Sequence, residues 1–119
     1  MKIKKSAIEN ICDAARNTYP NEFISLLGSK DGVIEELVVL PATYGRNFSS
    51  LRIDLLPPDS SVVGNIHSHP SPNATPSKAD IHVFRKTGQM HLIIAYPFSS
   101  ESIKAYNAEG NSIELEVIE

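Results

Sequence analysis

The alternation of apolar and polar residues divides the first third of the chain into one helix and two strands. Apolar side chains recur at helical spacing over residues 6–18, and Pro20 closes that pattern. Residues 22–28 and 33–40 have strand character, and Asp31-Gly32 between them favours the positive-φ turn of a hairpin. We therefore expect an N-terminal helix followed by a β-hairpin.

The middle of the chain predicts further strands around a second helix. Residues 51–55 alternate as in a half-buried strand, residues 62–66 form an apolar run, and residues 90–96 are typical of a central strand. Ile81 and Phe84 mark the apolar face of the second helix.

The last part of the chain predicts one more pair of strands. Residues 102–107 and 111–118 should pair antiparallel across Glu109-Gly110. Helices mixed with about seven strands favour an α/β sandwich. The order of the strands does not follow from the pattern.

Composition is ordinary for a globular protein. The chain has 119 residues, of which 41% are hydrophobic and 21% charged, so we expect one domain over residues 1–119, with its own core and no linker. The net charge of -3 argues against nucleic-acid binding, which usually requires a basic face. Lys2, Lys4 and Lys5 are better explained as a solvated helix start than as a phosphate-binding patch.

The location expected from the sequence is the cytoplasm. No apolar stretch approaches the roughly 20 residues that span a membrane, and the N-terminal residues lead into an amphipathic helix, not a signal-peptide core. The single cysteine, Cys12, cannot form an internal disulfide and should pack as a small residue on the first helix.

Candidate chemistry is concentrated between residues 66 and 80. His67 and His69 come at or just past a strand end, where residues two apart face the same side. Asp80 falls in the first turn of the second helix. Three such ligands leave the fourth position of a zinc ion for water, whereas closed structural sites are usually rich in cysteine. The pattern therefore favours a catalytic zinc site.

Each part of this motif also has a local interpretation. Two histidines at a strand end are often surface residues, and Ser77 with Asp80 has the spacing of a helix capping box. The short connection from His69 to Ser77 carries three prolines, which stiffen it and hold the histidines near the helix start. This proximity favours the ligand interpretation.

A hydrolytic zinc site also needs a general base to accept a proton from water. We select Glu22, which opens an apolar strand directly after the stop signal around Pro20. An ordinary solvated acid at a strand start is the alternative from position alone.

The combined pattern resembles a known family. Glu22, followed by His-x-His-Pro at 67–70 and Ser-x-x-Asp at 77–80, is similar to the signature of the JAMM, or MPN-plus, metalloproteases. The resemblance covers nearly the whole chain, and the compact form looks like the archaeal branch. It implies a cytidine-deaminase-like sandwich, with a mixed, curved β-sheet flanked by helices.

The resemblance also implies a role for each residue of the motif. His67, His69 and Asp80 bind one zinc ion, Glu22 is the general base, and Ser77 supports the oxyanion of the tetrahedral intermediate. The chemistry agrees, because one carboxylate can accept the proton of a water and return it to the departing amine. A well-placed hydroxyl donor to an oxyanion contributes about 3 kcal/mol.

Two further histidines do not extend the site. His82 lies where some larger relatives hold a second, structural zinc, but the additional Cys and His ligands of that site are missing here. His91 opens a predicted strand and is explained as a structural residue. We therefore expect one zinc ion per chain.

The expected substrate follows from the resemblance. Deubiquitinating relatives carry two insertions that hold ubiquitin, but only residues 86–89 separate the second helix from the next strand here. The preferred substrate is therefore a ubiquitin-like small modifier, cleaved after its C-terminal Gly-Gly. Alternatives are C-terminal trimming of a sulfur-carrier protein and a non-catalytic scaffold. A homodimer is a further expectation without an assigned surface.

Overall fold

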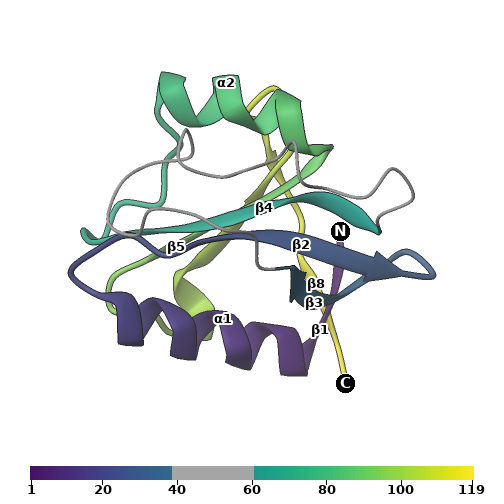
Figure 1. Cartoon of the computed structure of the whole chain (residues 1–119), viewed down its shortest axis with the longest axis horizontal. Helices are drawn as coiled ribbons and strands as arrows, with labels where there is room; N and C mark the ends of the chain where they lie inside the picture. Colours follow the sequence, from purple (N-terminus) through teal and green to yellow (C-terminus); the bar gives the residue numbers. More distant parts are fainter. Residues whose placement is uncertain (39–60) are drawn as a thin grey trace.

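An eight-stranded sheet separates two helices in the computed structural model of the chain, which describes residues 1–38 and 61–119 (Figure 1). Helix α1 (Lys5–Thr18) covers one face of the sheet and helix α2 (Lys78–Thr87) covers the other. Among these residues the strand order is β7-β6-β5-β4-β2-β3-β1-β8. The predicted α/β sandwich, with a mixed sheet between helices, is confirmed.

The sheet is mixed, with parallel pairs at its centre and at one edge, where β1 pairs with β3 and β8, and antiparallel pairs elsewhere. Strand β2 pairs antiparallel with both β3 and β4, whereas β4 and β5 run parallel. A short 3-10 helix (Ser100–Ser102) precedes β6. In chain order the strands are β1 (Lys2–Lys4), β2 (Ile24–Lys30), β3 (Val33–Val38), β4 (Val62–His69), β5 (Met90–Ala95), β6 (Ile103–Tyr106), β7 (Ser112–Ile113) and β8 (Glu116–Ile118).

The predicted hairpin forms as expected. Asp31 and Gly32 connect β2 to β3 with φ angles of 54° and 79°, which is the backbone conformation that a tight hairpin turn requires. The last two residues of the predicted second strand, 39 and 40, lie outside the described residues. So does the predicted strand over residues 51–55.

The solvated helix start expected for Lys2, Lys4 and Lys5 is confirmed for the exposed Lys5 and is wrong for the other two. Residues Lys2–Lys4 form β1, which pairs parallel with both β3 and β8, and α1 begins at Lys5. Ile3 is fully buried while its neighbours face outward. Because one apolar residue between lysines is too short for a periodic signal, the pattern did not identify this strand.

The predicted C-terminal strand is divided between the two ends of the sheet. Strand β7 pairs with β6, as expected, but β8 pairs with β1. Only Glu114 and Leu115 separate β7 from β8, so the two outermost strands lie no more than about 11 Å apart along the chain. The sheet therefore curls until its ends almost meet.

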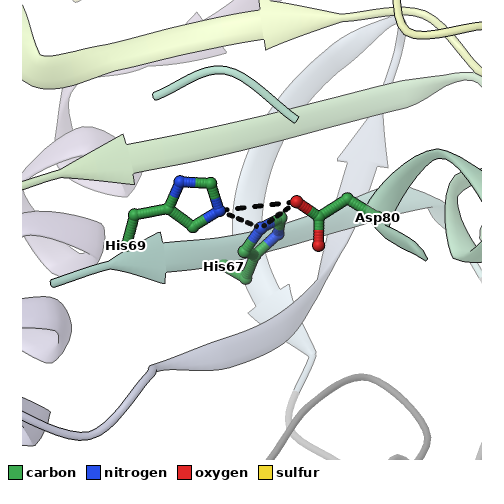
Figure 2. A group of neighbouring side chains, drawn as sticks. All are labelled: His67, His69 and Asp80. Carbon is green, nitrogen blue, oxygen red and sulfur yellow. Dashed lines mark hydrogen bonds and ion pairs between the residues drawn. The ribbon is translucent and has the colours of Figure 1, made fainter. Parts of the chain in front are cut away.

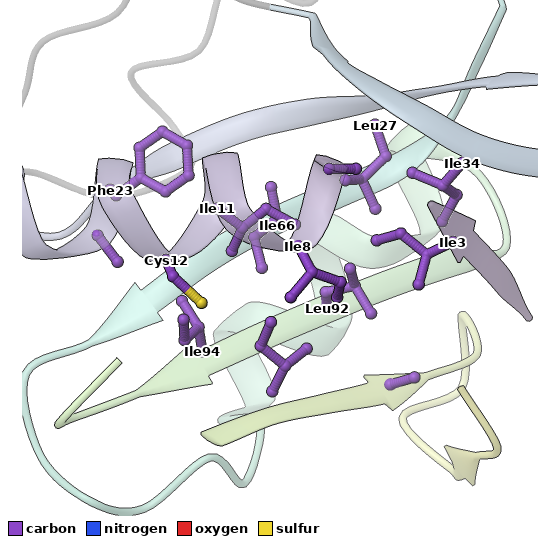
Figure 3. Close-up of a cluster of buried hydrophobic side chains, with 14 of the residues drawn as sticks. Ile3, Ile8, Ile11, Cys12, Phe23, Leu27, Ile34, Ile66, Leu92 and Ile94 are labelled. Carbon is purple, nitrogen blue, oxygen red and sulfur yellow. The ribbon is translucent and has the colours of Figure 1, made fainter. Parts of the chain in front are cut away.

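The main core lies between α1 and the sheet, as Figure 3 shows. Five residues of α1 are buried at helical spacing, namely Ala7, Ile8, Ile11, Cys12 and Ala15. They face Ile66 on β4 together with Leu92 and Ile94 on β5. Full burial of each large aliphatic side chain contributes about 1.5–3 kcal/mol. Ile66 thereby fixes which face of β4 points toward α1.

No helix in the described part of the chain is both long enough and apolar enough to cross a bilayer.

Candidate metal centre

Strand β4 brings two imidazoles onto the face opposite α1. Because side chains alternate along a strand and Ile66 points into the α1 core, His67 and His69 both point to the α2 side. Their Nε2 atoms lie 3.0 Å apart (Figure 2). His69 is the last residue of the strand, at the strand end as expected, and His67 lies two residues before it.

The first turn of α2 supplies the carboxylate. Oδ2 of Asp80 lies 3.4 Å from Nε2 of His67 and 3.4 Å from Nε2 of His69 (Figure 2). The predicted capping box is also present, since Ser77 Oγ accepts from the Asp80 amide while Asp80 Oδ2 accepts from the Ser77 amide. Asp80 is therefore both a member of the capping box and a candidate metal ligand.

These three atoms fit a zinc ion. Zinc binds histidine nitrogen and carboxylate oxygen at about 2.0–2.2 Å, so two ligands at a tetrahedral angle lie about 3.3–3.5 Å apart. The observed separations of 3.0, 3.4 and 3.4 Å are close to that value. The donor set of two imidazoles and one carboxylate also leaves room for water. His67, His69 and Asp80 are thus the residues that would hold the metal.

The connection between β4 and α2 orients one of the imidazoles. Nδ1 of His69 lies 2.8 Å from the backbone oxygen of Asn73, which can only accept, so Nδ1 carries the proton. In the neutral ring, Nε2 then directs its lone pair toward His67 and Asp80. The hydroxyl of Tyr106 donates to the Ala74 oxygen at 2.8 Å and ties the same connection to β6.

The electrostatics of the group favour a cation. The hydrogen bond to Asp80 raises the pKa of His69 in spite of its partial burial, and the charges of Asp80 and Glu22 add to this effect. Burial alone would raise the pKa of Asp80, but hydrogen bonds from His67 and His69 outweigh burial and hold that pKa well below its usual range. The negative charge of Asp80, which favours the protonated form of His69, would also attract a divalent metal ion.

Glu22 lies two residues before β2, which begins at Ile24 and not at residue 22 as predicted, and the strand register places it on the same face as the histidines. The register pairs Ile24 with His67, and the next residues are joined by the bond from the Ser68 amide to the Phe23 oxygen. Continuing by one more residue places Glu22 opposite His69. The half-buried carboxylate is close enough to contribute to the raised pKa of His69.

The structure separates these residues from the remaining histidines and the cysteine. His82 is exposed on α2. His91 is fully buried, stacks on Phe84 at 4.2 Å between ring centroids, and shares a 2.9 Å hydrogen bond with the Gly88 oxygen. Cys12 is buried, and burial raises the pKa of its thiol. None of the three belongs to the group around Asp80.

Three supporting contacts were not predicted. The Asn73 oxygen and the Tyr106 hydroxyl fix the connection after β4, and Ser68 bonds to Phe23 beside Glu22. A backbone oxygen has no sequence signal, and the Tyr106 contact spans 32 residues. Of the residues that make these contacts, only Ser68, between the two histidines, belongs to the motif identified from the sequence.

This fold and donor set define a compact metal-dependent hydrolase domain. Comparison with known proteins identifies the family: residues 4–109 match the model of the prokaryotic homologs of the JAB domain. A protein of Haloferax volcanii described as a probable metalloprotease is 32% identical, over 98% of this chain and 79% of its own length.

Solved structures agree with this assignment. A JAB1/MPN domain protein of Archaeoglobus fulgidus has a TM-score of 0.84 and 39% identity, with both chains fully covered. A structure described as a metalloprotease-like JAMM zinc site in the proteasome and signalosome has a TM-score of 0.81 and 37% identity, covering 100% of this chain and 98% of the other. The chain belongs to the prokaryotic JAB-domain family of JAMM metalloproteases. At the level of this family, the expected hydrolase class and zinc as the metal are confirmed.

Proposed function

We propose that this protein is a zinc-dependent peptidase that hydrolyses the bond after the C-terminal Gly-Gly of a ubiquitin-like small modifier. The observation that carries the proposal is the convergence of His67, His69 and Asp80 within 3.4 Å of one another, with Glu22 opposite His69. A zinc ion in such a site supplies Lewis acidity, which activates water at neutral pH and polarises a carbonyl oxygen.

Glu22 is the proton carrier in this proposal. Its carboxylate accepts a proton from the attacking water and then delivers it to the departing amine, which amide cleavage requires. Its place two residues before β2, next to the Phe23 that bonds to Ser68 of β4, keeps it on the side of the sheet where the histidines lie.

Ser77 is the proposed oxyanion donor. In the capping box its Oγ acts as an acceptor from the Asp80 amide, so the hydroxyl proton remains available for a second bond. Ser77 is exposed, and a hydroxyl there can reach a substrate carbonyl that lies beside Asp80.

A groove of about 360 Å³ lies beside His69 and is available to an extended substrate segment. It is lined by Asn73, whose backbone oxygen contacts the His69 ring, and by Ala95, which pairs with His69 in the sheet. Extended Gly-Gly segments carry no side chains, so they suit a groove of this kind. The cytoplasmic location and a homodimer stay predictions.

The test is intact-mass spectrometry of a small-modifier conjugate whose Gly-Gly tail is joined to a lysine. Zinc-loaded wild type should release the modifier with its mass ending after Gly-Gly, and Glu22→Gln should not. If zinc is bound but only a linear C-terminal extension is cleaved, the substrate is a sulfur-carrier-type precursor instead. Weak zinc binding by the wild type, together with a Glu22→Gln variant whose cellular role is unchanged, would support the non-catalytic scaffold.

A further inference from the structure

We propose that Ser68 is a positioning residue that holds Glu22 against the metal centre through a hydrogen bond to the neighbouring Phe23 amide. Ser68 Oγ accepts this bond at 2.7 Å. The inference rests on the proposed role of Glu22 as the base. It assigns a task to the residue between the two histidines, whose own side chain points away from them.

The hydrogen-bond pattern at the end of β2 shows why a side chain is needed here. The register of β2 with β4 reaches Ile24 and His67. In a regular hydrogen-bonded antiparallel pair, the next two residues would exchange two backbone bonds. Here the Ser68 amide donates to the Phe23 oxygen at 2.9 Å, but the Phe23 amide bonds to Ser68 Oγ. The hydroxyl therefore extends the pairing to the residue next to Glu22.

Burial makes this bond costly to lose. Ser68 is 1% exposed and Phe23 is 7% exposed. Removing the hydroxyl would leave the Phe23 amide buried without its acceptor, which costs free energy. The backbone can relieve this cost by moving away from β4. The Phe23 ring is fixed in the α1 core, so such a movement would pivot about that ring and displace Glu22.

Ser25 provides a matched control on the same strand. It is also 1% exposed, but its hydroxyl lies 3.2 Å from the Leu26 oxygen and 3.3 Å from the Val38 oxygen. Ser25→Ala thus removes a buried hydroxyl that faces β3 and leaves the bond between Ser68 and Phe23 intact. A general loss of stability should occur in both Ser25→Ala and Ser68→Ala, whereas Glu22 should be displaced only in Ser68→Ala.

The experiment compares Ser68→Ala, Ser68→Thr and Ser25→Ala in the full chain. In the zinc-free protein, NMR should show faster hydrogen exchange at Phe23 and a Glu22 amide order parameter that falls from about 0.85 toward 0.6 in Ser68→Ala alone. With zinc, kcat should fall tenfold or more in that variant, while KM and the zinc Kd stay within twofold. Ser68→Thr retains a hydroxyl, so its Phe23 exchange rate, its Glu22 order parameter and its kcat should all stay close to the wild-type values. Ser68→Cys, a weak acceptor of similar size, replaces the alanine variant if that variant does not fold.

The outcomes separate the two proposals. Equal order parameters and equal kcat values in Ser68→Ala and Ser25→Ala would overturn the role of Ser68, as would a threonine variant that behaves like alanine. If the wild type cleaves no Gly-Gly conjugate, the proposed function fails. The NMR readouts still decide in that case whether Ser68 holds Glu22.

Discussion

Ser77 and Asp80 exchange two hydrogen bonds, each side chain accepting from the backbone amide of the other residue, at 3.0 and 2.9 Å. The Asp80 oxygen that accepts from Ser77 is Oδ2, the same atom that lies 3.4 Å from both histidine Nε2 atoms. The capping box therefore fixes the rotamer of the proposed metal ligand. A local helix-start signal and a metal site share one atom.

Substitutions of Ser77 can separate capping from catalysis. Ser77→Ala should cost about 1 kcal/mol of stability by removing the N-cap, whereas Ser77→Gly should cost only a few tenths. If the hydroxyl also donates to the oxyanion, both variants should lose about 10²-fold or more in kcat. Urea denaturation and steady-state kinetics on the two variants measure this. A fully active Ser77→Gly would restrict Ser77 to capping.

Replacement of the proposed base should separate hydrolysis from metal binding. Glu22→Gln should lower kcat by 10²-fold or more, the usual contribution of a general base, and leave the zinc Kd within twofold. The matched control is Glu109→Gln, at an exposed acid in the turn between β6 and β7, which should change neither quantity. Glu22→Gln with more than half of the wild-type kcat would exclude Glu22 as the base.

Acid should destabilise the fold through His91. Burial lowers the pKa of His91 to about 4, whereas the unfolded chain takes up the proton near pH 6.5. The unfolded state thus binds more protons between these values, and stability should fall as the pH drops from 6.5 toward 4, by up to about 1.4 kcal/mol per pH unit. Metal-free wild type and His91→Gln should be compared by urea denaturation at pH 6.5 and 4.5. Equal losses in both would show that His91 is not the cause.

The close approach of β4 and β5 should exclude a larger residue at position 64. A Cβ built on Gly64 would lie 1.4 Å from the Met90 oxygen, and only a separation of the two strands could relieve that overlap. Gly64→Ala should therefore lower the free energy of unfolding by about 3 kcal/mol or more. Gly32→Ala, at φ +79° with nothing within 4 Å, should cost about 1–2 kcal/mol. Urea denaturation midpoints measure both losses. Equal midpoints for Gly64→Ala and Gly32→Ala would contradict this packing.

The metal group was predictable because its information is local. His67 and His69 share one strand, and Asp80 follows after a short, proline-rich connection, so spacing alone places them together. The helices and the first hairpin follow from periodicity and from Asp31-Gly32 for the same reason.

Long-range pairing was not predictable in the same way. Strand β8 leaves β7 after two residues to pair with β1, a choice set by the curl of the sheet and not by the sequence pattern around Glu116. The role of Ser68 depends on where the backbone pairing of β2 and β4 ends, which periodicity does not reveal.

Zinc titration of the metal-free chain tests the central claim most directly, namely that His67, His69 and Asp80 form one metal centre. Isothermal titration calorimetry should give one zinc ion per chain for wild type. Asp80→Asn should raise the Kd at least tenfold, whereas Asp13→Asn, an exposed carboxylate on α1, should leave it unchanged. A wild type that binds no zinc, or an Asp80→Asn that binds as tightly as wild type, would contradict the claim.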